Sequence, residues 1–475
     1  VTARVIKAAA ELRVIGRAGI GVDNVDVGAA SRRGIVVMNT PTGNAVTTAE
    51  HAIALLFAVA RKIAAADASL KKGAWEKKKF EGRELSGKTL GVVGLGNIGR
   101  IVANRAQGLH MHVIGYDPVV TSERAAELGV ELVSLDQLFQ RADAITVHTP
   151  MTPETKGLVN HDSLKKLKRG VILINAARGG IYDEAALLAG LESGQIGGVA
   201  LDVFPKEPPG LTDIVRHPSV VVTPHLGAST EEAQSRVAVE IAQQVVAYLT
   251  TGSISNAVNV PSVPGEMAPL LGPYLSLARR VGRFLAQVEA FEPRSISVEC
   301  EGEAANVTTG PIVNAALAGL LQNFFDAPVN AVSAPVLARD SGIQVNERKS
   351  TRKGEFTTLV TVLVVGKDGR ELIAGGTLAA DGSPRLARWG NYELDAHLDG
   401  SILVMKNADR PGVIGTIGTL LGESGVNVSR MQMGLDVGQR QAASLWALDS
   451  VLPTGVLDRI RQVKEVQQAC GIVIQ

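Results

Sequence analysis

The sequence predicts an α/β protein whose largest domain is a doubly wound parallel sheet. Six short runs rich in apolar and β-branched residues follow one another, with amphipathic or apolar helical stretches between most of them. These runs span residues 90–93, 113–116, 144–148, 171–175, 199–203 and 220–223. Near-continuous apolar strands that alternate with helices are typical of a parallel sheet covered on both faces. Residues 63–230 are therefore predicted to form one doubly wound α/β domain.

Further elements flank this domain on both sides. Residues 13–15 and 35–38 have the pattern of two more buried strands, and residues 47–61 have that of a helix. After the domain, Ser229 and Glu232 match a capping box that opens a long helix reaching about residue 249. Because this helix can return to the N-terminal segment, residues 1–62 and 231–256 are predicted to form a second domain.

Two smaller domains are predicted in the C-terminal half. Residues 256–264 contain two prolines and no hydrophobic periodicity, which indicates a linker. Residues 257–395 contain an alternating strand pattern and a β-hairpin pattern, so an α+β domain is expected there. Residues 396–475 then restart with the order strand, helix, strand, strand, helix, strand, a βαββαβ unit.

Composition excludes several classes of protein. The chain has 475 residues, with 48 Lys and Arg against 47 Asp and Glu. Its net charge of +1 gives no electrostatic reason to expect nucleic acid or an anionic membrane as a partner. Two cysteines cannot build a disulfide framework or a cysteine metal site, so we expect no metal and a reducing, cytoplasmic compartment. The longest dense apolar run, residues 53–60, is far shorter than the ~20 residues that span a bilayer.

A glycine motif at the start of the central domain predicts a nucleotide site. Gly94, Gly96 and Gly99 directly follow the first strand and precede an amphipathic stretch. In a Rossmann fold, these glycines allow a tight turn, close approach of a pyrophosphate, and close packing of helix on strand. Asp117, at the end of the next strand, would accept hydrogen bonds from ribose hydroxyls and repel a 2′-phosphate. The alternative is an ordinary glycine-rich turn, but strand, helix and acidic residue together favour NAD.

Three polar residues follow three later strands of the predicted sheet. They are Arg178, Glu207 and His225. Ligands of open α/β sheets bind outside the carboxyl ends of the strands. A histidine there can exchange the proton that accompanies a hydride, a carboxylate can stabilise the imidazolium, and an arginine can hold a carboxylate. Each residue alone is explained equally well by a structural role, but their joint placement favours a catalytic trio.

The segments around these residues resemble the D-2-hydroxyacid dehydrogenase family. The resemblance is carried by GRAGIGVDNVD, GVVGLGNIGR, NAARGG, LDVFPKEP and TPHLGAST. In the C-terminal part, NADRPGV followed by GVNV resembles an ACT domain. Nearly the whole chain is thus similar to the long form of the family, which has an intervening domain before the ACT domain. The resemblance implies that the Rossmann domain is inserted in a flavodoxin-like substrate domain. Family members carry further βα units before the position of Val1, so this substrate domain is expected to be incomplete at its N-terminus.

The resemblance also implies a reaction and its residues. The expected reaction is the NAD-dependent oxidation of 3-phospho-D-glycerate to 3-phosphohydroxypyruvate, the first step of the phosphorylated route to L-serine. His225 would be the proton donor or acceptor, Glu207 its partner and Arg178 the substrate anchor. Asp202 would accept a hydrogen bond from the carboxamide of NAD. The implied cofactor contacts are Thr40, Gly94, Gly96, Asn97, Ile98, Gly99, Asp117, Thr149, Ala176, Ala177, Arg178, Asp202, His225, Leu226, Gly227 and Ala228.

Further residues are implied for substrate and effector. The substrate carboxylate and phosphate would bind near Arg17, Gly19 and Gly21, with Lys78 a weaker candidate because a lysine run is usually a solvated surface. In ACT domains of this family, serine binds between subunits, and the matching positions are Asp409 and Asn427. Local loop and cap hydrogen bonds are the alternative explanation for both. A homo-oligomer, dimer or tetramer, is expected.

Two other functions stay open at the level of sequence. The first is a related dehydrogenase acting on 2-oxoglutarate, hydroxypyruvate or glyoxylate, because part of the phosphate-binding set lies in the segment that is missing here. The second is an NAD-sensing binding protein like the corepressors built on this fold. The catalytic trio and the ACT domain argue against the second.

Overall fold

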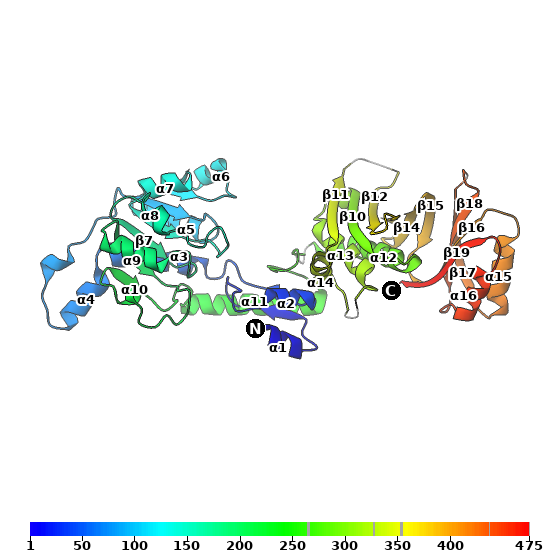
Figure 1. The fold of residues 1–475 in the computed structure, drawn as a ribbon, viewed down its shortest axis with the longest axis horizontal. Coiled ribbons are helices and arrows are strands. Elements are labelled where there is room, and N and C mark those ends of the chain that lie inside the picture. Colours follow the sequence, from blue (N-terminus) through cyan, green and yellow to red (C-terminus); the bar gives the residue numbers. More distant parts are fainter. Residues whose placement is uncertain (264–266, 326–327, 352–354, 437, 475) are drawn as a thin grey trace. The chain divides into compact units, whose positions relative to one another are not determined.

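A computed structural model describes residues 1–263, 267–325, 328–351, 355–436 and 438–474. The chain divides into two compact units. We call Ala18–Ile20 with Thr40–Ile241 the central unit. We call Val1–Arg17, Gly21–Asn39 and Ala242–Gln475 the terminal unit. Each unit is described by itself, and Figure 1 labels the elements of both.

The central unit is built on a seven-stranded parallel sheet with the order β5-β4-β3-β6-β7-β8-β9. Its strands are β3 (Thr89–Val93), β4 (His112–Tyr116), β5 (Glu131–Leu132), β6 (Ala144–Val147), β7 (Val171–Asn175), β8 (Ile196–Leu201) and β9 (Val220–Val222). All six predicted runs form strands, which confirms the doubly wound fold. The sequence order reverses direction between β3 and β6, where such sheets bind ligands.

Helices cover both faces of this sheet (Figure 1). Alternate residues of β7 point to opposite faces of the sheet. Ile172 and Ile174 pack in the core on one face, and Val171 and Leu173 pack in the core on the other. The helices of this unit are α3 (Ala45–Ala60), α4 (Ile63–Lys71), α5 (Gly99–Gly108), α6 (Ser122–Glu127), α7 (Leu135–Arg141), α8 (His161–Leu164), α9 (Glu184–Glu192) and α10 (Asp213–Arg216), with a 3₁₀ turn η1 (Lys77–Phe80). Helix α3 shares a core with α5 and the sheet. The predicted boundary instead assigns α3 to the second domain, so the unit begins earlier than predicted.

An ion pair at the amino end of β6 gives the central unit a pH-dependent contribution to stability. Asp143 contacts the Lys168 ammonium at 2.7 Å and accepts the Thr89 N–H at 2.9 Å. Burial is the largest single influence on the pKa of Asp143 and raises it, but Lys168 and Thr89 outweigh burial and hold the pKa below its usual value. The pair therefore stabilises the fold above the unfolded-state pKa of about 4, and this stability is lost as the pH falls.

We expect Asp143→Asn to lower the free energy of unfolding by about 1–2 kcal/mol near neutral pH. Urea unfolding of variant and wild type should show that difference near pH 7, and the difference should shrink as the pH falls below about 4. Asp67→Asn is the matched control, because its pair with Lys71 is exposed on α4 and is expected to change stability by less than about 0.5 kcal/mol. A difference that persists in acid would contradict the assignment.

The long helix α11 (Glu231–Thr251) begins where predicted, but its cap differs from the prediction. The hydroxyl of Thr230 accepts the N–H of Ala233 at 3.2 Å. The predicted capping box used Ser229 and Glu232. Because the helix starts at Glu231, Thr230 is the residue at the capping position, three residues before Ala233.

The terminal unit contains a short N-terminal segment with α1 (Ala3–Ala8), β1 (Val14–Gly16), α2 (Val27–Arg32) and β2 (Val36–Met38). Strands β1 and β2 form a parallel pair, as the two predicted buried runs suggest. The predicted linker lies along β2: the Val258 N–H donates to the Val37 carbonyl at 2.8 Å. The Asn259 side chain accepts the Val37 N–H at 2.9 Å and donates to the Ile35 carbonyl at 2.9 Å. The linker therefore satisfies backbone groups at the edge of this strand pair.

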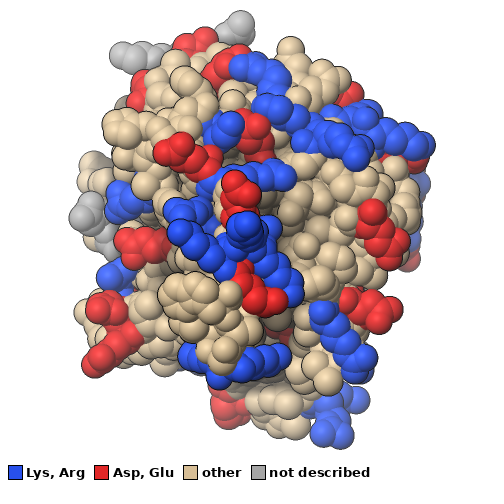
Figure 2. All heavy atoms as spheres, turned by 90° about the vertical axis from the view of Figure 1, so that its left-hand side faces the viewer, with Lys and Arg blue, Asp and Glu red and all other residues tan. Residues whose placement is uncertain are grey.

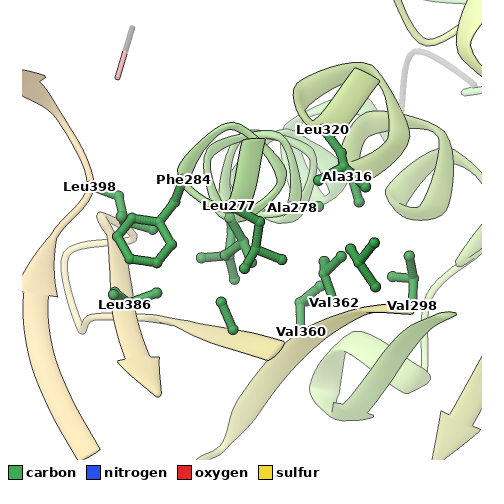
Figure 3. Close-up of a cluster of buried hydrophobic side chains, with 14 of the residues drawn as sticks. Leu277, Ala278, Phe284, Val298, Ala316, Leu320, Val360, Val362, Leu386 and Leu398 are labelled. Carbon is green, nitrogen blue, oxygen red and sulfur yellow. The ribbon is translucent and has the colours of Figure 1, made fainter. Parts of the chain in front are cut away.

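The next part of the terminal unit is an α+β domain with the sheet order β11-β10-β12-β13-β14-β15. Its elements are α12 (Ala268–Val288), β10 (Pro293–Gly302), η2 (Glu303–Ala305), α13 (Gly310–Leu321), α14 (Ser333–Asp340), β11 (Gln344–Ser350), β12 (Thr358–Gly366), β13 (Glu371–Leu378), β14 (Pro384–Trp389) and β15 (Tyr392–His397). The predicted hairpin is confirmed by the antiparallel pairing of β12 with β13. Figure 3 shows Leu277 and Phe284 of α12 and Leu320 of α13 above Val360 and Val362 of β12.

The C-terminal part has the predicted βαββαβ order. Its elements are β16 (Gly400–Ala408), α15 (Val413–Glu423), β17 (Val428–Asp436), β18 (Gln441–Leu448), α16 (Thr454–Arg461) and β19 (Val466–Ile474). The strands form an antiparallel sheet of order β17-β18-β16-β19. Leu403 and Met405 face a core with α15 and α16, whereas Ile402 and Val404 join the core of the preceding domain. The two C-terminal domains therefore share one continuous apolar core.

Charges of both signs lie on the face that Figure 2 presents. In Figure 2, Lys and Arg side chains stand beside Asp and Glu side chains over the face that is presented, in keeping with the net charge of +1. Among the described residues, none of the helices combines the length and the apolar character required to cross a bilayer.

Candidate active site

Two members of the predicted trio are in direct contact at the carboxyl edge of the central sheet. His225 Nδ1 lies 2.8 Å from Glu207 Oε2. The other carboxylate oxygen of Glu207 accepts the Phe204 N–H at 3.1 Å, which holds the side chain beside its own loop. An ionised carboxylate only accepts hydrogen bonds, so Nδ1 of His225 carries the proton and Nε2 can act as the acceptor. The His225 side chain is half exposed, so a ligand can reach it.

Arg178 lies in the neighbouring loop, after β7. The buried Asn175 side chain holds this loop, because it accepts the Ala177 N–H at 3.0 Å and donates to the Arg178 carbonyl at 2.8 Å. Gly179 follows, and a Cβ at this position would lie 2.0 Å from the carbonyl carbon of Phe204. Only a glycine lets the Arg178 loop and the Glu207 loop approach so closely. The three residues thus occupy adjoining loops of one edge, as predicted.

Asp202 organises the backbone around His225. It is fully buried after β8, and its carboxylate accepts the Leu226 N–H at 2.7 Å, the Gly227 N–H at 2.8 Å and the Thr223 hydroxyl at 2.6 Å. Burial is the largest influence on the pKa of Asp202 and raises it. Hydrogen bonds from His51, Thr223 and Leu226 outweigh burial and keep the pKa below its usual value, so the group stays ionised.

His51 joins this network and was not predicted from the sequence. Its Nε2 lies 3.2 Å from both Asp202 Oδ1 and Thr223 Oγ1. In the sequence it is one of several polar positions in the first half of α3, and nothing in that pattern indicates which sheet residue it meets.

The glycine motif forms the predicted tight turn between β3 and α5. Gly94 has a positive φ of 89°, and a Cβ there would lie 2.8 Å from the His148 carbonyl oxygen. A Cβ at Gly99 would lie 1.8 Å from the Gly94 carbonyl oxygen, whereas one at Gly96 would meet nothing within 4 Å. The turn is therefore closed on its inner side and open at Gly96. This shape fits a pyrophosphate that approaches the backbone at Gly96 and the N-terminus of α5.

These contacts predict three different outcomes for alanine at three glycines. Gly99→Ala is expected to lower both the melting temperature and NAD affinity, because its methyl group collides with the turn. Gly96→Ala should weaken NAD binding about tenfold or more with little change in melting temperature. Gly108→Ala, at the exposed end of α5 with open space around it, should change neither binding nor folding adversely. Thermal unfolding and NAD titration by fluorescence measure both quantities, and equal NAD affinity in all three variants would contradict the site.

Asp117 fixes the same turn. Its Oδ2 accepts the Leu95 N–H at 2.8 Å, and its Oδ1 accepts the N–H groups of Val119 and Val120 at 2.8 and 3.2 Å. A carboxylate has about four acceptor positions, so one position on Oδ2 is left for a ribose hydroxyl. The predicted ribose contact is compatible with this arrangement.

The other predicted cofactor residues also lie in the central unit. The hydroxyl of Thr149 is buried without a hydrogen-bond partner, as expected of a group that meets a ligand. Asn97 donates to the Pro41 carbonyl at 3.2 Å, and Thr40 accepts the Gly19 N–H at 2.8 Å. The remaining predicted contacts are Ile98, at the start of α5, Ala176 and Ala177, buried after β7, and Leu226, Gly227 and Ala228, after His225.

Several predicted site residues are not brought into this group. Arg17 and Gly21 belong to the terminal unit, so their substrate contacts stay a prediction. Lys78 is exposed in η1, among other lysines beside Trp75. Asp409 and Asn427 are exposed on the loops after β16 and before β17, where a serine contact also stays a prediction.

Two family models match the chain. The NAD binding domain of the D-isomer specific 2-hydroxyacid dehydrogenases matches residues 53–227. The intervening domain of D-3-phosphoglycerate dehydrogenase matches residues 270–389. The first covers the sheet with the trio and the glycine turn, and the second covers the six-stranded domain of the terminal unit.

Similar proteins extend over almost the whole chain. A D-3-phosphoglycerate dehydrogenase of Synechocystis is 42% identical over 470 residues, which cover 99% of this chain and 85% of the relative. Another from Archaeoglobus fulgidus is 43% identical and covers 91% of this chain and 82% of the relative.

Solved structures match about half of the chain. D-lactate dehydrogenase of Aquifex aeolicus, complexed with NAD and lactic acid, has a TM-score of 0.50 and 30% identity over 55% of this chain and 84% of that one. NAD-dependent formate dehydrogenase of Staphylococcus aureus, in complex with NAD, has a TM-score of 0.51 and 32% identity over 55% of this chain and 80% of that one. The chain therefore belongs to the D-isomer specific 2-hydroxyacid dehydrogenase family, in its D-3-phosphoglycerate dehydrogenase branch, and is an NAD-dependent oxidoreductase.

Proposed function

We infer that the chain oxidises the C2 hydroxyl of 3-phospho-D-glycerate to 3-phosphohydroxypyruvate, the first step of the phosphorylated route to L-serine. The observation that carries this proposal is the 2.8 Å contact of His225 Nδ1 with Glu207 Oε2 at the carboxyl edge of the sheet that also carries the glycine turn. The relatives named D-3-phosphoglycerate dehydrogenase support the substrate. When bound, NAD accepts the hydride from C2 at its nicotinamide ring.

The histidine supplies the proton chemistry of this reaction. Nε2 of His225 accepts the hydroxyl proton as the C2–H bond breaks, so one proton and one hydride leave the alcohol together. Glu207 accepts the hydrogen bond from Nδ1–H throughout and stabilises the imidazolium that forms. Because Glu207 is held by the Phe204 N–H, it keeps the imidazole orientation constant. In the reverse direction the same imidazolium protonates the carbonyl oxygen.

The arginine holds the substrate in the required orientation. The guanidinium of Arg178 offers a planar pair of donors to the substrate carboxylate and to the developing carbonyl oxygen. Arg17, Gly19 and Gly21 are proposed to bind the carboxylate and phosphate ends, with Lys78 as a weaker phosphate contact. Asp202, which has an acceptor position left on Oδ2, is proposed to accept a hydrogen bond from the carboxamide of NAD.

The test compares phosphorylated and unphosphorylated substrates. NADH absorbance is followed with 3-phosphoglycerate, D-glycerate, D-lactate and 2-hydroxyglutarate, in the presence of a carbonyl trap for the product. We expect the highest kcat/KM for 3-phosphoglycerate. Preference for 2-hydroxyglutarate or an unphosphorylated acid would support a related dehydrogenase instead. NAD binding without turnover of any of these acids would support a binding protein.

We also propose an effector, an oligomeric state and a compartment. L-serine is a candidate effector at Asp409 and Asn427 of the ACT domain, and a homo-oligomer would supply the second subunit of such a site. Both cysteines are free, Cys300 buried and Cys470 half-buried, which supports a reducing cytoplasmic compartment. Isothermal titration with serine and sedimentation analysis test the first two points.

A further inference from the structure

We propose that His51 is a positioning residue for the dehydrogenase reaction, acting through Asp202 on the loop that carries His225. The inference rests on the proposed function, because it assigns His225 the proton transfer. Among the residues that the structure describes, His51 hydrogen-bonds to the segment before His225 through the Thr223 side chain. It hydrogen-bonds to neither Glu207 nor Arg178. It belongs to α3, a different element from the strands and loops of the trio.

The hydrogens of this network can be assigned from chemistry. Thr223 Oγ1 lies 2.6 Å from Asp202 Oδ1, and an ionised carboxylate only accepts, so the threonine proton points to Asp202. The threonine oxygen can then meet His51 only as an acceptor. Nε2 of His51, 3.2 Å from both oxygens, therefore carries a proton that is shared between Asp202 and Thr223. His51 closes a ring of three side chains around one carboxylate oxygen.

The Asp202 carboxylate holds the chain segment that carries the catalytic imidazole. Its two oxygens accept the N–H groups of Leu226 and Gly227, the two residues after His225. The main-chain carbonyl of Asp202 also accepts the His225 N–H at 2.9 Å. His225 has a φ of 56°, a left-handed conformation that a residue other than glycine keeps only when its surroundings hold it. A change in Asp202 is therefore transmitted to His225.

His51 holds Asp202 from α3, an element outside the loop. The Asp202 side chain is fully buried and the His51 side chain is only 19% exposed, so water does not readily replace the imidazole donor. Without the His51 imidazole, Asp202 Oδ1 keeps two donors, the Thr223 hydroxyl and the Leu226 N–H. Both belong to the segment that Asp202 holds in place. The carboxylate and the loop then lose their link to α3, and the distance between His225 and a bound hydroxyl becomes less well defined. Geometry of this kind acts on kcat, because it changes the transferring groups and leaves the substrate contacts in place.

The test compares two replacements of His51. His51→Gln places an amide N–H near the position of Nε2, whereas His51→Leu keeps the volume and removes the donor. We expect His51→Leu to lower kcat about tenfold with less than a twofold change in the KM for 3-phosphoglycerate, and His51→Gln to restore most of the loss. His112→Leu, an exposed histidine at the start of β4, is the control for the substitution itself.

A second readout needs no substrate. Hydrogen–deuterium exchange of the apo chain should be faster in the peptide containing residues 223–228 for His51→Leu, and close to wild type for His51→Gln. If the wild type turned over no hydroxy acid, the proposed function would fail while this exchange difference still tested the network. If His51→Leu did not fold, His51→Asn, whose amide is one carbon too short, would take its place in the comparison.

The route through Asp202 is tested by combining variants. In an Asp202→Asn background, His51→Leu should lower kcat by less than about twofold, because the charge that it positions is gone. A further tenfold loss of kcat in the Asp202→Asn background would overturn the proposal. So would equal effects of His51→Gln and His51→Leu on kcat, or a change confined to KM.

Discussion

Replacing His225 with alanine is expected to lower kcat for 3-phosphoglycerate oxidation about a thousandfold, with a smaller change in KM. The expectation follows from the assigned protonation: Nδ1 donates to Glu207, so Nε2 is the imidazole nitrogen that can accept the hydroxyl proton. Without it, the proton passes to water, which is a poor base. Initial rates of NADH formation at saturating NAD measure the effect directly.

Two companions make this prediction specific. Glu207→Gln keeps the size of the side chain but cannot stabilise the imidazolium by charge, so we expect a smaller loss, about tenfold to a hundredfold. His217→Ala replaces a half-buried histidine before β9 whose ring accepts the Ser219 N–H, and it should leave kcat unchanged. If His225→Ala retained the wild-type rate, the proposed proton transfer would have to be abandoned.

Most of the fold could be predicted because its strands are buried on both faces. Ile172, Ile174, Val171 and Leu173 all serve a core, so the run is apolar throughout and stands out in the sequence. Strand β5 has only two residues, and the residues of β11 are almost all exposed and polar, so neither carries such a signal. The amphipathic pattern of α3 shows that one face is buried, but it cannot show that this face covers the central sheet.

The site was predictable to the extent that it follows from strand ends. Arg178, Glu207 and His225 each lie in the loop that follows a strand of a parallel sheet, and such ends meet at one edge by geometry alone. His51 and Gly179 were not predictable as site residues, because their roles depend on contacts with Asp202 and Phe204, which are distant in sequence. Asp117 shows a third case: the sequence singles it out as a ribose contact, which stays a prediction, and its hydrogen bond to the glycine turn is visible only in the structure.

Arg178→Ala is expected to reduce kcat/KM for 3-phosphoglycerate at least about a hundredfold, through both a higher KM and a lower kcat. The Arg178 guanidinium donates to the Ala177 carbonyl at 2.7 Å, and the next residue, Gly179, lacks a side chain and so lets this loop meet the Glu207 loop. The substrate carboxylate therefore loses its charged partner beside the proton acceptor, which weakens both binding and orientation. Arg178→Lys should recover only part of the loss, because an ammonium is a point charge and not a planar fork.

The same variant separates catalysis from cofactor binding. The glycine turn and Asp117 are unchanged in Arg178→Ala, so its NAD affinity should stay within about threefold of wild type. Arg169→Ala is the matched control. Arg169 lies on the turn before β7, at the end of the strand opposite to Arg178, and its guanidinium donates to the Ser193 carbonyl at 3.4 Å. Retention of full turnover by Arg178→Ala would contradict the role of the arginine. Loss of NAD binding together with turnover would mean that Arg178 holds the cofactor more than the substrate, since a pure substrate anchor acts only after NAD is in place.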